Sequence, residues 1–110
     1  MDTKKYKLKA ADIKALVPNI GGCLATDKIT VEGKLVGFMY REEPDNDLDR
    51  GWRMLAGDES DAYLDNPGSA GVYEVNTIAN YDPAIIPYLQ YPYGAELERI
   101  KGSDQFKLKV

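Results

Sequence analysis

Two segments of the chain, residues 35–41 and residues 51–56, carry large apolar side chains at every second position. A period of two is typical of β-strands, because successive side chains of a strand point to opposite sides of the sheet. Apolar side chains also stand next to each other in these segments, as in Phe38 and Met39. We therefore predict that both segments are central strands of an antiparallel sheet, with at least part of each face covered.

Weaker patterns predict the other elements of the fold. Short apolar or alternating runs predict strands at residues 23–26, 71–76 and 105–110, of which the last is an edge strand. Apolar stripes, capping residues and prolines predict short helices or helical turns at residues 10–17, 57–65, 77–81, 95–100 and after Asp82-Pro83, with Asn76 as the cap of the third. The chain is thus expected to form a single α+β domain over residues 1–110, with a mostly antiparallel sheet of about five strands and short helices packed on it.

The length of 110 residues and the hydrophobic share of 44% are typical of a small globular protein. A domain of this size buries about two thirds of the surface that its unfolded chain exposes. No apolar run approaches the roughly 20 residues that a membrane helix needs. The N-terminus also carries no apolar stretch of the signal-peptide type. We therefore expect a soluble, cytoplasmic protein without a membrane partner, and we favour a monomer.

The chain contains one cysteine, Cys23, and no histidine. A cysteine is reactive when a nearby cation stabilises its thiolate and solvent reaches it, and the sequence neighbours of Cys23 are uncharged. We expect Cys23 to be an inert residue of the core, together with Phe38, Trp52 and Leu55. A single cysteine cannot form an internal disulfide, so the sequence does not indicate an oxidising compartment.

The acidic residues are concentrated in one part of the sequence. Residues 42–65 contain nine acidic side chains and two arginines, a local charge of −7, whereas the whole chain carries −4. A negative field repels nucleic acids and attracts basic protein surfaces. The segment therefore predicts either a surface for a basic protein partner or a solvated loop that keeps the protein soluble.

Two further segments have the composition of interaction sites. Residues 88–94 include Tyr91 and Tyr93, which would serve either as anchors in an interface or as lids over the sheet. Residues 1–9 contain four lysines and would be either an arm for nucleic acid or a solvated terminus, extended or frayed. Because neither arginines nor several aromatic residues accompany these lysines, we expect the solvated terminus and no nucleic-acid partner.

The spacing of Asp45, Asp47 and Asp49 resembles the opening of a calcium-binding loop. If Asp45 is the first position of such a loop, Arg50 occupies the sixth, where glycine is required, and Ala56 occupies the twelfth, where a bidentate glutamate is required. The rest of the loop therefore lacks the necessary ligands. We expect no metal site and no cofactor.

The sequence lacks the usual signals of an enzyme. Histidine, the side chain best suited to proton transfer near neutral pH, is absent. The three serines lie in polar, turn-like contexts without a base beside them, and no glycine pattern matches a phosphate-binding or dinucleotide-binding loop. Acidic pairs are abundant, but in solvated loops they lack the burial that would raise the pKa of one member. We therefore expect a protein that is not an enzyme.

Several blocks of the sequence together resemble one bacterial family. The blocks are residues 21–29, 36–44, 49–53, 57–59, 76–83 and 85–89, with Tyr93-Gly94 and Glu98-Arg99. They resemble the small immunity proteins of polymorphic-toxin systems, long filed as a domain of unknown function, and the Gly51-Trp52-Arg53 and Asn80-Tyr81-Asp82-Pro83 blocks are the most distinctive. The resemblance implies a non-enzymatic protein that binds and neutralises a partner toxin.

The charge pattern and the resemblance together predict a mechanism of occlusion. The acidic loops would meet a basic surface of a cognate toxin, such as the substrate cleft of a nuclease, and tyrosines would add apolar anchors. The residues expected at this surface are Glu42, Glu43, Asp45, Asp47, Asp49, Asp58, Glu59, Asp61, Tyr91 and Tyr93. Two alternatives remain at this stage: a small-molecule-binding or regulatory module, and a small hydrolase or metal-dependent enzyme.

Overall fold

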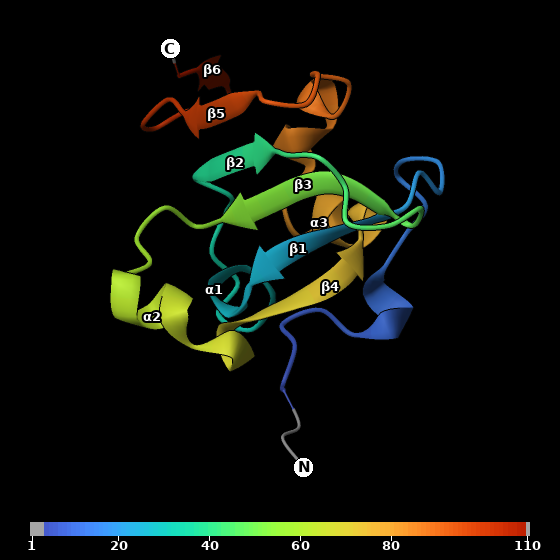
Figure 1. The fold of residues 1–110 in the computed structure, drawn as a ribbon. Coiled ribbons are helices and arrows are strands. Elements are labelled where there is room, and N and C mark those ends of the chain that lie inside the picture. Colours follow the sequence, from blue (N-terminus) through green and yellow to red (C-terminus); the bar gives the residue numbers. More distant parts are fainter. Residues whose placement is uncertain (1–3, 110) are drawn as a thin grey trace.

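The fold is built on a six-stranded sheet in the order β4-β1-β3-β2-β5-β6, in a computed structural model that describes residues 4–109 (Figure 1). The strands are β1 (Gly22–Thr26), β2 (Phe38–Arg41), β3 (Asp49–Leu55), β4 (Ala70–Glu74), β5 (Glu96–Arg99) and β6 (Phe106–Leu108). The helices are α1 (Asp27–Thr30), α2 (Asp61–Asp65) and α3 (Val75–Tyr81), with 3-10 turns η1 (Ala10–Asp12), η2 (Pro67–Ser69) and η3 (Pro83–Tyr88).

The sheet is mixed. Strand β1 pairs with β3 in parallel, and the other four neighbouring pairs are antiparallel. The predicted α+β fold with a mostly antiparallel sheet is therefore confirmed, with one strand more than the sequence indicated. The two segments that the alternating pattern identified, now β2 and β3, are neighbours at the centre of the sheet.

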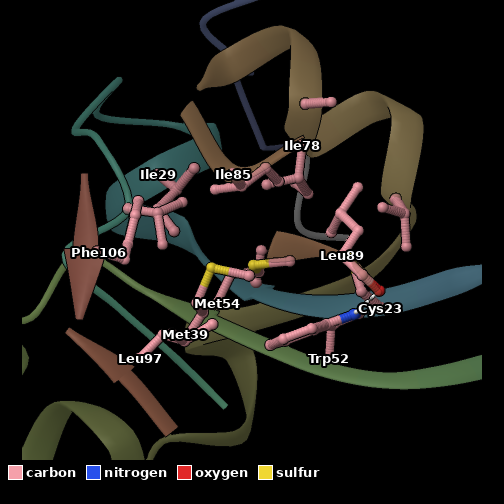
Figure 2. Close-up of a cluster of buried hydrophobic side chains, with 14 residues drawn as sticks. Cys23, Ile29, Met39, Trp52, Met54, Ile78, Ile85, Leu89, Leu97 and Phe106 are labelled. Atoms are coloured by element: carbon pink, nitrogen blue, oxygen red, sulfur yellow. Dashed lines mark hydrogen bonds between the residues drawn. The ribbon is translucent and has the colours of Figure 1, made fainter. Parts of the chain in front are cut away.

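One face of the sheet is covered by helical segments and forms the hydrophobic core (Figure 2). Trp52 and Met54 of β3 point to this face, where they meet Ile78 of α3 and Ile85 of η3, and all four side chains are fully buried. The indole Nε1–H of Trp52 donates a hydrogen bond to the carbonyl of Leu89, 3.3 Å away. A buried N–H without a partner would be costly, so this bond allows a large side chain to occupy the centre of the core.

The opposite face of the sheet presents the alternate positions of the same strands. Because side chains alternate along a strand, the neighbours of Trp52 and Met54 in β3, Arg53 and Leu55, lie on this second face. Phe38 of β2 lies beside Leu55 in the register of the two strands and is half-buried like it. Cys23 and Trp52 are therefore in the core, whereas Phe38 and Leu55 lie on the second face.

The predicted helix at residues 10–17 is wrong, because only η1 forms a short turn and the chain then becomes extended at Ile13. Tertiary hydrogen bonds replace the helical ones: the N–H of Lys14 donates to Asn80 Oδ1 (2.9 Å), and the N–H of Leu16 donates to Asn76 Oδ1 (2.8 Å). A helix this short is marginal in water, so these bonds decide the local structure. Asn76 was expected to cap α3, but its side chain holds this segment instead, and α3 begins at Val75.

The helical turn predicted at residues 95–100 is also wrong, because these residues form β5. Leu97 lies opposite Met39 of β2 and is buried, while Glu96 and Glu98 are exposed. The free edge of β2 needs backbone partners, and a segment that alternates in this way supplies them. Helices α2 and α3 and the turn η3, which starts after Asp82, confirm the other helical predictions. Strand β6 lies at one edge of the sheet, as predicted for residues 105–110.

The N-terminal segment is docked onto the domain in the part that the structure describes. Lys4 Nζ forms an ion pair with Asp27 of α1 at 2.8 Å, and the N–H of Lys7 donates to the carbonyl of Thr30. The fraying predicted for residues 1–9 falls partly on residues 1–3, which lie outside the described residues.

Candidate partner-binding surface

The acidic loop between β2 and β3, residues 42–48, is organised by an ion pair inside β3. The guanidinium of Arg53 donates two parallel hydrogen bonds to the carboxylate of Asp49, from Nη1 to Oδ1 (2.9 Å) and from Nη2 to Oδ2 (2.8 Å). Its Nε donates a third bond to Glu42 Oε2 at 2.5 Å. The Arg53 side chain is only 5% exposed, so its charge is neutralised within the protein. Bidentate arginine–carboxylate pairs are among the stronger polar contacts of proteins.

The same carboxylate also fixes the backbone of the loop. Asp49 accepts hydrogen bonds from the N–H of Asp45 and the N–H of Gly51, both at 2.9 Å. The N–H of Leu48 donates to the Asn46 side chain, and the N–H of Gly22 in β1 donates to the Leu48 carbonyl at 2.6 Å. These hydrogen bonds hold the backbone of the loop against β1 and β3.

These contacts shift the pKa values of the pair in opposite directions. The hydrogen bonds from Arg53, aided by the backbone N–H groups, hold the pKa of Asp49 well below its usual range. The hydrogen bond to Asp49 raises the pKa of Arg53 further above its ordinary value. Both groups are therefore charged at every physiological pH. Asp45, whose side chain is 81% exposed, lies 3.8 Å from Arg53 at the edge of this network.

A groove of about 550 Å³ lies on the second face of the sheet, between the acidic loop and β4. Arg53 and Asp49 line it on one side, and Leu24 of β1 lies between them and Val72 of β4. Two of its apolar residues are strongly exposed for their type: Leu48 at 79% and Val72 at 77%. The groove therefore joins exposed apolar surface to the acidic loop.

The second acidic segment, residues 58–65, lies at the other end of β3. The loop of residues 42–48 precedes the first residue of β3, and residues 58–65 follow its last residue, so the length of the strand separates them. Figure 1 shows the loop after β2 at one end of β3 and α2 beyond the other. The sequence suggested one continuous acidic patch, and the structure divides it into two.

Two of the four acids of this second segment, Asp58 and Glu59, are engaged in contacts within the domain. Asp58 accepts from Lys34 Nζ at 2.6 Å and lies 3.5 Å from Lys28 Nζ, and the bond from Lys34 lowers its pKa. Burial raises the pKa of Glu59, but bonds from the Thr26 hydroxyl and from two backbone N–H groups outweigh it and leave the pKa lowered. Asp61, in contrast, is exposed in the first turn of α2.

The predicted tyrosines lie on the side of the acidic loop. Arg41 of β2 stacks over the ring of Tyr93, with 4.6 Å from its guanidinium carbon to the ring centre, and donates a hydrogen bond to the Tyr91 carbonyl. A shallow depression brings Tyr93 next to Glu42 and Glu43. Tyr93 is exposed, whereas Tyr91 is half-buried against Tyr88. The structure thus places Tyr93 with the first acidic loop and turns much of Tyr91 toward the domain.

The remaining candidate groups have no reactive surroundings. Burial raises the pKa of the Cys23 thiol to about 12, and the positive charge of Arg53 offsets this only in part. Within residues 4–109 no cluster of three or more cysteine or acidic side chains is arranged to hold a metal ion. In the same described part of the chain, no helix is long and apolar enough to cross a membrane.

Sequence reasoning missed the two features that shape the surface. In the sequence Arg53 counts only as a charge that offsets the acids, and the strand pattern indicates only that it lies on the opposite face from Trp52 and Met54. The sequence places Val72 in a strand but does not indicate to which face of the sheet its side chain points. Its exposure depends on β4 being at the edge of the sheet. The first feature required the tertiary partners of Arg53, and the second required the strand order.

The comparisons with known proteins identify one family. The family model described as the Immunity protein Imm33 domain matches residues 23–109, most of the chain. The match covers the sheet from β1 to β6, the acidic loop and both tyrosines. Neither the search of curated proteins nor the search of solved structures found a match.

Proposed function

The chain belongs to the Imm33 immunity protein family, and on that premise we propose that it binds and neutralises a partner toxin without catalysing a reaction. The partner in this proposal is a basic protein, and neither nucleic acid nor a membrane takes part. The protein acts as a cytoplasmic monomer that covers the working surface of the toxin. Resemblance between sequences and the match to the family model support the toxin as the kind of partner.

The observation that carries the proposed binding surface is the prearranged acidic loop, residues 42–48. Glu43, Asp45 and Asp47 are exposed on it, while Asp49 and Arg53 hold its backbone in place. A rigid loop loses little conformational entropy when a partner binds, and complementary charges speed the association. The surface therefore extends over the acidic loop and Tyr93, and the acids beyond the far end of β3 contribute less because Asp58 and Glu59 are already engaged.

The experiment begins with the capture of the tagged protein from its own cells and identification of the protein that it retains. The purified pair is then measured with a triple variant, Glu43→Gln, Asp45→Asn and Asp47→Asn. We expect the variant to bind at least about tenfold more weakly, mainly through slower association, and to depend less on salt. Cells that produce the toxin together with the triple variant should grow more slowly than cells that produce it together with the parent protein.

A matched control tests the division of the acids into two groups. The triple variant Asp58→Asn, Asp61→Asn and Asp65→Asn removes the same charge at the other end of β3 and should change the affinity by no more than about twofold. Equal losses in both variants would show that only the net charge matters. An unchanged affinity and salt dependence in the first variant would exclude the acidic loop as the binding surface.

The groove supports a second candidate function, that of a module that binds a small molecule. Its volume of about 550 Å³ lies within the range of ligand sites, about 300–1,000 Å³. Native mass spectrometry of the protein purified from its own cells, followed by gentle denaturation, would release such a ligand. A stoichiometric small molecule together with the absence of any captured protein would favour this function over the binding of a toxin.

A further inference from the structure

We propose that the groove between the acidic loop and β4 receives one basic side chain of the partner protein, a lysine or an arginine with its long apolar stem. This inference rests on the proposed function and names the contact by which the partner is recognised. This contact differs from general attraction by the acidic loop, because one side chain of a particular shape enters a particular groove.

The walls of the groove fit the stem of such a side chain. Leu48 on the loop and Val72 on β4 are strongly exposed and line the groove together with Leu24. Lysine and arginine bury their methylene groups along apolar surface while the charged end stays near polar groups. A groove with apolar walls and an acidic rim provides both environments for one side chain.

The charges of the groove select a cation over an anion. Asp45, Asp49 and Glu74 line it, and Arg53 is the one cation among its lining residues in the described structure. The charge of Arg53 is already taken up by Asp49 and Glu42. Within residues 4–109 Glu74 forms no ion pair, and it is exposed. The groove therefore carries net negative charge with carboxylates available on both rims.

The groove is also formed before the partner arrives. The N–H of Gly22 donates to the Leu48 carbonyl, and a Cβ atom at Gly21 would lie 2.7 Å from that carbonyl oxygen, so the close approach of loop and β1 requires glycine there. Together with the Asp49–Arg53 pair, this contact fixes the distance between the loop and β4. A preformed groove is typical of sites that hold a single anchoring side chain.

The first test fills the groove from within. The substitution Val72→Arg places a guanidinium in the groove, and because Val72 is 77% exposed the variant should fold normally. We expect its affinity for the captured partner to fall at least about tenfold, since anchoring contacts carry a large share of binding energy. The control Leu108→Arg, at a 52% exposed position of the opposite edge strand β6, should stay within about twofold of the parent.

The second test uses small probes and needs no partner. In NMR titrations, N-acetyl-arginine amide or N-acetyl-lysine amide should shift the amide signals of Gly22, Leu24 and Val72, and N-acetyl-norleucine amide should shift them much less. Val72→Arg should abolish these shifts, whereas Leu108→Arg should retain them. Equal shifts with the neutral probe would overturn the inference and indicate a site for apolar small molecules.

The two tests separate the inference from the function on which it rests. If the captured partner binds Val72→Arg as tightly as the parent, the groove is not the contact, although the neutralisation of a toxin still stands. If no partner is captured while the arginine and lysine probes occupy the groove, the site is confirmed as specific for cations and the proposed function fails.

Discussion

Asp49 and Arg53 lie four residues apart in β3, and the strand bulges between them so that their side chains form a bidentate ion pair. On the neighbouring strand, the partners of these two residues are Gly22 and Leu24, which are only two residues apart. The extra residues of β3 are accommodated at Gly51, whose φ is +84°. In a regular strand, residues four apart are separated by about 13 Å, so the bulge is what brings the two charges together.

The pair should contribute strongly to stability. We expect Asp49→Asn to lower the free energy of unfolding by about 3 kcal/mol, because it leaves a buried guanidinium with Glu42 as its main remaining partner. Asp45→Asn, at an 81% exposed position, should cost less than about 1 kcal/mol. Urea denaturation, followed by the fluorescence of Trp52, measures both. Equal costs for the two variants would contradict the role assigned to the buried pair.

The stability should fall in acid with a slope that depends on Asp49. Its pKa in the folded protein is lower than in the unfolded chain, where an aspartate has a pKa of about 4. On acidification the unfolded chain therefore binds a proton first, so the contribution of Asp49 is complete above about pH 5 and is lost progressively below about pH 4. Asp58 and Glu59 act in the same direction.

Denaturation curves collected between about pH 6 and about pH 3 would test this expectation. The parent protein should lose more stability over this range than Asp49→Asn, since the variant has no carboxyl group to protonate at this position. Parallel curves would show that other carboxyl groups cause the loss.

The bulge should require glycine at position 51. In Gly51→Ala the new Cβ would lie 2.1 Å from the carbonyl oxygen of Glu42, in a backbone conformation that alanine rarely adopts. We expect a cost of about 3 kcal/mol or more. Gly102→Ala is the matched control, because Gly102 has a similar φ of +78° and open space around it, and it should cost about 1 kcal/mol. Thermal unfolding measures both variants. The loss of stability in Gly102→Ala gives the conformational cost, and the additional loss in Gly51→Ala gives the steric cost.

The segment after η1 should be released when its side-chain anchors are removed. Asn76 accepts hydrogen bonds from the N–H groups of Leu16 and Val17, and Asn80 accepts one from Lys14 and donates another to its carbonyl. In the double variant Asn76→Ala, Asn80→Ala, amide hydrogen exchange of Lys14, Leu16 and Val17 should accelerate at least about tenfold, while that of β1 and β3 should change little. Faster exchange throughout the sheet would show instead that the asparagines support the whole domain.

Local patterns predicted the central part of the fold. The alternation in residues 35–41 and 51–56 identified β2 and β3, and the capping residues around Asp82 identified the start of η3. These predictions succeed because they depend on neighbours in the sequence, which determine the periodicity of side chains and the first turn of a helix. The segment at residues 95–100 failed because its structure depends on β2, which lies far away in the sequence.

The candidate surface could be predicted only in part. The sequence by itself determined the acidic composition of residues 42–65, the central strands and the resemblance to an immunity protein family. The tertiary structure alone decided that these acids lie at the two ends of β3, that Arg53 neutralises Asp49, and that Val72 forms one wall of a groove. The physical reason is that charge and periodicity belong to the local chain, whereas pairing and exposure follow from strand order and register, which bring distant segments into contact.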